Sequence, residues 1–152
     1  MSSRTVVIAT PEPLGHRRAG PAVRAIRTAE AVAAAGHAVT LVATDPAPVA
    51  VAPTDVTVVG AEAAPRDAEV YLVTGRAMLD LAWLADTEAV VGVDLYDPFQ
   101  LEALHRGGPD RIRRIDLAEG AHLTLAAQLA RGDRFFCANE AQRSLWLGYL
   151  GA

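Results

Sequence analysis

The chain has 152 residues, a net charge of −4 at pH 7 and a hydrophobic content of 51%. This length fits one compact domain, which buries roughly 68–70% of its unfolded surface and needs no disulfide or metal for stability. A single Cys excludes an internal disulfide and a multi-cysteine zinc site. No apolar run reaches the roughly 20 residues of a membrane-spanning helix. The first apolar run follows the N-terminus without a secretory signal pattern, so we expect a cytoplasmic protein.

The charge is unevenly distributed. All 14 basic residues are Arg. Residues 1–76 contain seven Arg and seven acidic residues, whereas residues 77–152 contain seven Arg and eleven acidic residues. Nucleic-acid binding requires a broad basic face, so this composition predicts no nucleic-acid partner. A local group of arginines could still hold one small phosphate.

Short apolar runs alternate with helical patterns along the chain. Strands are expected at residues 6–9, 38–43, 56–59, 70–73, 89–93 and 135–138. Helices are expected from Pro21 to the stop at Gly36, over residues 77–84 and 99–104, over a longer stretch from Ile112 to near Gly132, and after Asn139. Residues 107–109 predict a break between the third and fourth of these helices. At the start of the last helix, Asn139 and Gln142 have the spacing of a capping box.

This alternation predicts an α/β fold: a Rossmann-like parallel sheet with helices on both faces, in a single domain. Ligands of such sheets bind at the carboxyl ends of the strands. Any site should therefore be built from the loops at residues 10–20, 44–55, 74–76, 94–98 and 139–140.

The first of these loops carries glycines and arginines ahead of a helix. Its candidate anion-binding residues are Gly15, Arg17, Arg18, Gly20 and Arg24. No G-x-G-x-x-G pattern is present, and Pro21 stands where a Walker A loop requires Lys, so nucleotide hydrolysis is not indicated. The loop is predicted either to hold a phosphate or to be a solvated surface loop.

Asp94 and Asp97 follow the strand expected at residues 89–93. A carboxylate held at the end of a rigid strand can accept a proton from a nucleophilic hydroxyl, which makes Asp94 the candidate catalytic residue. The alternative is a turn, since Asp and Pro are common turn residues. If Asp94 has the catalytic role, Asp94→Asn should lower turnover with little change in folding stability.

No metal site is predicted. The four histidines lack the i, i+4 spacing of a zinc-binding helix. Cys137 is expected inside the last strand as a small core residue, and Trp146 and Tyr149 are expected to pack against the core.

Three segments together resemble the N-terminal domain of two-domain (GT-B) nucleotide-sugar glycosyltransferases, closest to the retaining, family-four-like group. They are residues 20–41, residues 93–98 and residues 131–140 with Gln142, Arg143 and Trp146. Many members of that group have His where this chain has Asp94.

The resemblance implies that residues 1–152 are the acceptor-side half of such an enzyme, without the C-terminal nucleotide-binding domain. The loop from Gly15 to Gly20 would approach the donor's phosphates or sugar, and Asp94 would face the reacting sugar. Tyr96, Asp97, Asn139 and Glu140 would line the acceptor cleft. The expected partners are a nucleotide-sugar donor and an acceptor hydroxyl, with no further cofactor and no activity of this chain alone.

Two other functions remain open. One is a non-catalytic Rossmann-like binding or scaffolding module. The other is a small nucleotide-binding protein, which the missing glycine fingerprint disfavours.

Overall fold

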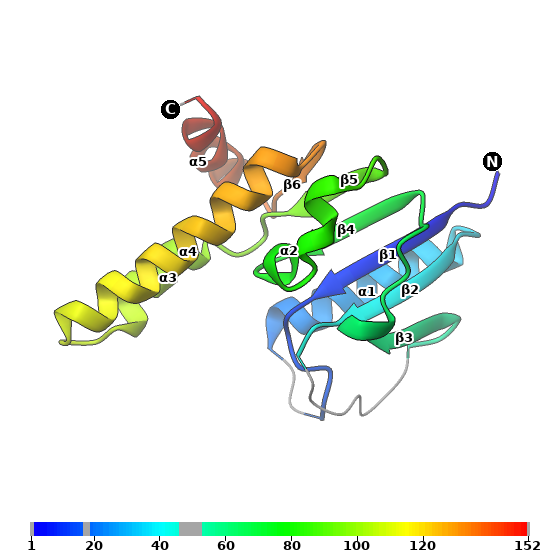
Figure 1. The fold of residues 1–152 in the computed structure, drawn as a ribbon, viewed down its shortest axis with the longest axis horizontal. Helices are drawn as coiled ribbons and strands as arrows, with labels where there is room; N and C mark the ends of the chain where they lie inside the picture. The colour runs from blue at the N-terminus through cyan, green and yellow to red at the C-terminus, as the bar shows by residue number, and fades with distance from the viewer. Residues whose placement is uncertain (1, 17–18, 46–52, 152) are drawn as a thin grey trace.

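The computed structural model describes residues 2–16, 19–45 and 53–151 as an α/β domain (Figure 1). The strands are β1 (Thr5–Thr10), β2 (Ala38–Ala43), β3 (Val56–Gly60), β4 (Val70–Thr74), β5 (Val90–Asp94) and β6 (Arg134–Phe136). The α-helices are α1 (Gly20–Ala34), α2 (Ala77–Asp80), α3 (Phe99–Arg106), α4 (Arg111–Arg131) and α5 (Glu140–Leu150). Two 3₁₀ helices, η1 (Ala61–Ala63) and η2 (Ala82–Asp86), complete the described elements.

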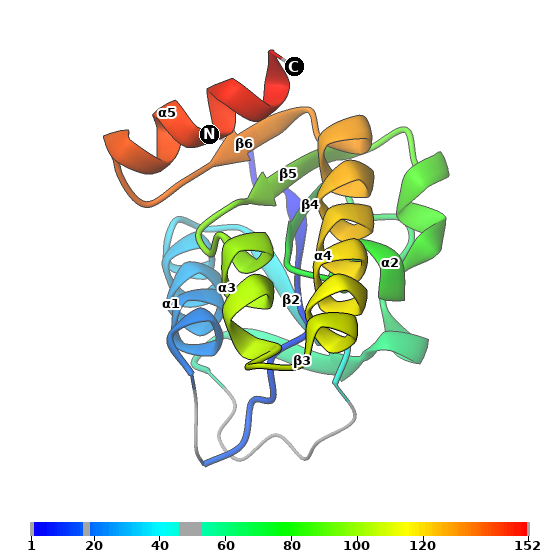
Figure 2. The same ribbon diagram turned by 90° about the vertical axis from the view of Figure 1, so that its left-hand side faces the viewer.

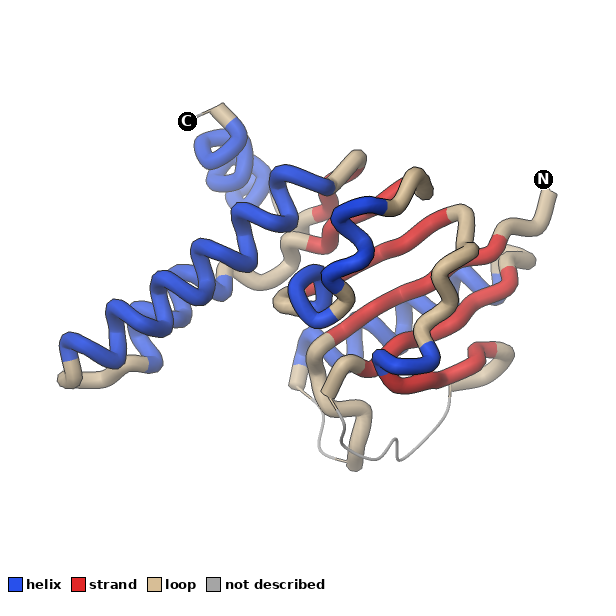
Figure 3. Tube along the Cα trace, viewed as in Figure 1, coloured by secondary structure: helices blue, strands red, loops and turns tan. Residues whose placement is uncertain are grey.

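The six strands form one sheet in the order β3-β2-β1-β4-β5-β6, and every neighbouring pair is parallel. Figure 3 shows the strands, in red, lying side by side, with the helices in blue around them. The predicted Rossmann-like parallel sheet is thereby confirmed. The order reverses beside β1, since the chain runs outward through β2 and β3 and then returns to β4 on the other side. Ligands of open α/β sheets bind at such a switch point.

Helices cover both faces of the sheet (Figure 2). Along β1 the side chains alternate with the two-residue period of a strand. Val6 and Ile8 pack in the cluster that holds the buried face of α1, whereas Val7 and Ala9 pack in the cluster that holds α2, η2 and Leu125 of α4. Burial on both faces explains why these strands are short continuous apolar runs.

Two predicted elements differ from the structure. The helix expected over residues 77–84 breaks at Leu81 into α2 and η2. Met78, Leu81 and Leu84 are all buried, and their spacing of three fits the three-residue turn of a 3₁₀ helix better than an α-helix.

The last strand ends earlier than expected. β6 stops at Phe136 because its neighbour β5 ends at Asp94, and the final bond of the ladder runs from the Leu95 amide to the Phe136 carbonyl (2.7 Å). Cys137 therefore lies beyond the strand and is half-buried, so the prediction that places it inside the strand is wrong.

The hairpin of α3 and α4 projects beyond the carboxyl edge of the sheet (Figure 1). We call its projecting part, residues 99–118, the arm. The predicted break at residues 107–109 is confirmed, and Asp110 caps α4 by accepting hydrogen bonds from the Ile112 and Arg113 amides (2.9 and 3.1 Å). Gly107 allows the two helices to approach, because a Cβ there would lie 2.7 Å from Arg114 Cα.

Candidate functional site

A cleft of about 490 Å³ lies at the carboxyl edge of the sheet, where the arm meets the ends of β1, β4 and β5. Its floor comes from the loops after β1 and β4 and from the end of β5, and its wall comes from α3 and α4. The charged residues that line it are Glu12, Arg76, Asp94, Asp97, Arg106 and Asp116. The cleft therefore occupies the switch-point position where open parallel sheets bind ligands.

Asp94 is the last residue of β5, so the buried strand fixes where its carboxylate lies. Arg24 of α1 binds both carboxylate oxygens, with its Nε 2.6 Å from Oδ2 and its Nη2 3.1 Å from Oδ1. The Asp94 side chain is 10% exposed and the Arg24 side chain is 36% exposed. Such a bidentate contact between an arginine and a carboxylate is strong and directional. It holds the carboxylate in one orientation at the cleft.

The same guanidinium lies over the ring of Tyr96, with its Cζ 4.8 Å from the ring centroid. The hydrogen bond that Arg24 donates to Asp94 raises the pKa of Arg24, and burial opposes this shift only in part. Arg24, Asp94 and Tyr96 also line a small adjoining pocket. Arg24 thus has an anionic partner within the protein, whereas from the sequence it is a candidate for binding a phosphate or sugar of the donor.

The predicted phosphate loop is only partly described. Arg17 and Arg18 lie outside the described residues. Gly20 is the first residue of α1, and a Cβ there would lie 3.8 Å from the Tyr96 hydroxyl. Gly15 and Gly20 are absent from the described residues that line the cleft, although Pro21 lines it.

Asn139 and Glu140 lie at the start of α5 and serve that helix. The Asn139 side chain accepts a hydrogen bond from the Gln142 amide (2.9 Å), which confirms the predicted cap. The Gln142 side chain accepts from the Ala138 amide and donates to the Tyr96 carbonyl (both 2.8 Å). Glu140 pairs with Arg143 (2.9 Å). In the described part of the chain, neither Asn139 nor Glu140 lines the cleft.

Asp97 belongs to a group of carboxyl groups around the cleft. The pKa of Asp97 is raised to about 6, mainly by burial and further by a hydrogen bond with Glu102 and by the charges of Glu102 and Glu12. Arg106, which pairs with Glu102 (2.9 Å), opposes the rise. An acid with this pKa changes protonation close to neutral pH, so it can both donate and accept a hydrogen bond from a ligand hydroxyl.

The wall of the cleft contains a glycine that packing does not require. Gly120 lies within α4, and a Cβ there would meet no atom within 4 Å. Glycine inside a helix lowers stability by roughly 0.5–1 kcal/mol relative to alanine. Because Gly120 has no side chain, the wall of the cleft is open at this position.

Sequence reasoning missed Glu12, Arg76, Arg106, Asp116 and Gly120 as cleft residues. Glu12 and Arg76 lie in the loops at residues 10–20 and 74–76, which the sequence predicts at the carboxyl edge of the sheet. Their place in these loops was the signal that could have identified them. The other three lie on helices, and only the direction of the arm brings them to the cleft.

Within the described residues, no group of three or more His, Cys, Asp or Glu side chains is arranged to hold a metal ion. None of the helices in residues 2–16, 19–45 and 53–151 has the length and apolar character needed to cross a bilayer. No model of a known protein family and no curated protein matches this chain. The structure itself shows a Rossmann-like parallel α/β domain with a cleft at the switch point of its sheet.

Proposed function

We propose that this domain is the acceptor-side half of a glycosyltransferase, and that the cleft binds a hydroxyl-rich acceptor. The observation that carries the proposal is the cleft itself: about 490 Å³ at the switch point, with carboxyl groups from separate elements along its lining. Carboxylates are good partners for sugar hydroxyls because each oxygen accepts hydrogen bonds. The resemblance to GT-B enzymes supports the same assignment.

In the proposed reaction Asp94 or Asp97 orients an acceptor hydroxyl and receives its proton. The hydroxyl oxygen bonds to the donor's anomeric carbon, and the nucleoside diphosphate leaves with the electron pair of the broken bond. A second, nucleotide-binding domain would form the opposite wall of the cleft. Sugar transfer requires both walls, because catalysis depends on stabilising the transferring sugar and the leaving phosphate together.

A specific observation favours a binding module as the second candidate. Arg24 already neutralises Asp94 through two contacts. A carboxylate so paired can still orient a hydroxyl through its remaining lone pairs, so the contact suits binding at least as well as proton transfer.

The test is an NMR titration of the chain with small glycosides, read as backbone amide shifts. We expect shifts at the cleft residues, and we expect nucleotide sugars to bind weakly because the chain supplies one wall. Shifts confined to another surface, or tight binding of a nucleotide sugar to this chain alone, would contradict the proposal.

A matched pair of glycine variants sharpens the test. Gly120→Leu places a side chain in the cleft. Gly148→Leu places the same side chain on α5, outside the cleft lining. A Cβ at either position would meet no atom within 4 Å. Gly120→Leu should weaken glycoside binding by roughly tenfold or more, and Gly148→Leu should leave it unchanged. Equal effects of the two variants would show that the ligand binds elsewhere.

A further inference from the structure

The free end of the arm combines exposed apolar side chains with a local excess of positive charge. Ile112 is 71% exposed and Leu104 is 53% exposed. Residues 105–115 contain four arginines and a single acidic residue, Asp110, in a chain whose net charge is −4. Residues 105–115 at the end of the arm therefore have a charge opposite in sign to that of the molecule as a whole.

The arginines at this end are only partly used within the protein. Arg106 pairs with Glu102, and Arg114 donates to the Gly108 carbonyl (3.1 Å). The guanidinium groups of Arg111 and Arg113 have no hydrogen-bond or ion-pair partner among the described residues. Both are exposed. They are free to meet an external anion.

These arginines lie at the amino end of α4, which the Asp110 carboxylate caps. The first turn of α4 contains arginines and no acidic residue. The amino end of a helix carries a partial positive charge, so cations there are repelled. The single carboxylate of Asp110 faces three arginines in residues 111–114, so an external anion would add compensating charge at this helix end.

We propose that the free end of the arm docks on an anionic lipid surface, with Ile112 and Leu104 entering the headgroup region and the arginines binding lipid phosphates. Apolar side chains among arginines are the composition of interfacial membrane anchors. A nucleic acid would satisfy the arginines but offers no apolar region for Ile112. Because the arm projects from the body (Figure 1), its end can reach a flat surface before the acidic remainder of the molecule does.

This proposal is independent of the proposed function, and vesicle binding tests it without sugar or nucleotide. The unaltered chain is floated with vesicles of phosphatidylcholine alone and with vesicles of equal parts phosphatidylcholine and phosphatidylglycerol. We expect binding to the anionic vesicles, and weaker binding as salt is raised, since salt screens exposed charges. No binding, or equal binding to both kinds of vesicle, would overturn the proposal.

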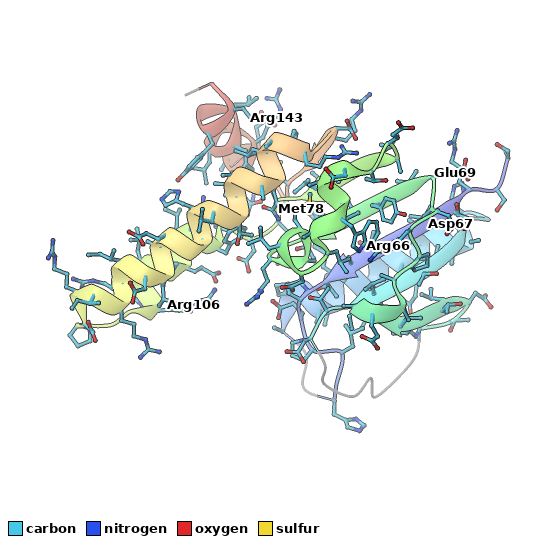
Figure 4. All side chains as sticks on the ribbon, viewed as in Figure 1. Arg66, Asp67, Glu69, Met78, Arg106 and Arg143 are labelled. Atoms are coloured by element: carbon cyan, nitrogen blue, oxygen red, sulfur yellow. The ribbon has the colours of Figure 1, made fainter. Side chains whose placement is uncertain are left out.

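Two pairs of variants locate the contact. Arg111→Gln with Arg113→Gln should weaken binding by about tenfold or more, because each arginine near an anionic surface contributes separately. Its control is Arg134→Gln with Arg143→Gln, two exposed arginines outside the arm; Figure 4 labels Arg143 on α5 and Arg106 on the arm. An equal loss from the control pair would overturn the proposal.

Ile112→Ser tests the apolar contribution, and Leu123→Ser is its control on the same helix, at a residue 67% exposed. Ile112→Ser should weaken vesicle binding several-fold while Leu123→Ser leaves it unchanged. If Ile112→Ser has no effect and heparin competes fully with the vesicles, the surface binds acidic polymers and the lipid proposal is wrong. Thermal melts of all variants confirm that they are folded.

Discussion

The contact between Asp94 and Arg24 changes the effect on stability that is expected of a substitution at Asp94. From sequence alone, Asp94→Asn is expected to leave stability almost unchanged. In the structure Asp94 holds Arg24 through two contacts and is only 10% exposed. Removing one partner of a buried ion pair leaves the other without compensation, which is the costly part. The expectation of unchanged stability is therefore revised.

We expect Asp94→Asn and Arg24→Gln each to lower the free energy of unfolding by about 1–2 kcal/mol, less than for a fully buried pair because Arg24 is 36% exposed. A double-mutant cycle measured by urea unfolding should give a coupling energy of similar size. Arg27→Gln is the matched control on α1, since Arg27 pairs with Glu30 at 76% exposure. A coupling energy near zero would mean that the contact contributes nothing to stability.

Asp97 gives a prediction about pH. Its folded-state pKa is raised from 3.8 to about 6, so the folded protein binds an extra proton between these values. The stability contributed by this group is present below its unfolded pKa and is lost as the pH rises through about 6. At neutral pH the protein retains an unfavourable half-buried charge.

Asp97→Asn removes that charge, so the melting temperature of the variant relative to the unaltered protein should be higher at about pH 8 than at about pH 5. Asp86→Asn, at an exposed position outside the cleft, should show no such trend. A difference in melting temperature that stays constant with pH would show that Asp97 has no raised pKa.

At the scale of elements, sequence patterns predicted where helices and strands occur better than how they meet. The strand at residues 38–43 matches β2, since a buried strand between Gly36 and a proline-rich connector has clear limits. The contact between Arg24 and Asp94 joins residues 70 positions apart, and no local pattern encodes it. Similarly, the place of Asp116 and Gly120 in the cleft follows from the direction of the arm.

The turn of the arm provides the element-scale prediction. A Cβ on Gly107 would lie 2.7 Å from Arg114 Cα, a backbone atom that cannot move without shifting α4. Gly107→Ala should therefore destabilise the protein by about 1–3 kcal/mol. Gly120→Ala, with no atom within 4 Å of the added Cβ, should stabilise it by about 0.5–1 kcal/mol. Thermal unfolding of both variants tests this, and a tolerated Gly107→Ala would show that the arm has no close turn.

At the scale of the whole molecule, the domain combines a well-packed body with a weakly buried arm. Both faces of β1 and β4 contribute to apolar clusters, and β5 packs one face, through Val91 and Val93, in one of them. Of the side chains in α3, only Gln100 and Ala103 are buried, and the amide of Gln100 has no hydrogen-bond partner among the described residues. An unpaired buried amide costs about 1–3 kcal/mol. The arm therefore gains less from docking than its length implies.

This difference predicts two classes of amide in hydrogen exchange followed by mass spectrometry. Amides of β1, β4 and β5 should exchange only through global unfolding, since opening the central strands breaks both apolar clusters. Amides of α3 and of residues 111–118 should exchange through a separate, lower-energy opening, because four of their six large apolar side chains (Leu101, Leu104, Ile112 and Ile115) are already exposed. Raising the urea concentration should accelerate exchange of the central strands far more than exchange of the arm, since global unfolding exposes more surface. If both regions exchange at one rate with one urea dependence, the arm unfolds together with the body and the weak docking inferred from Gln100 is wrong.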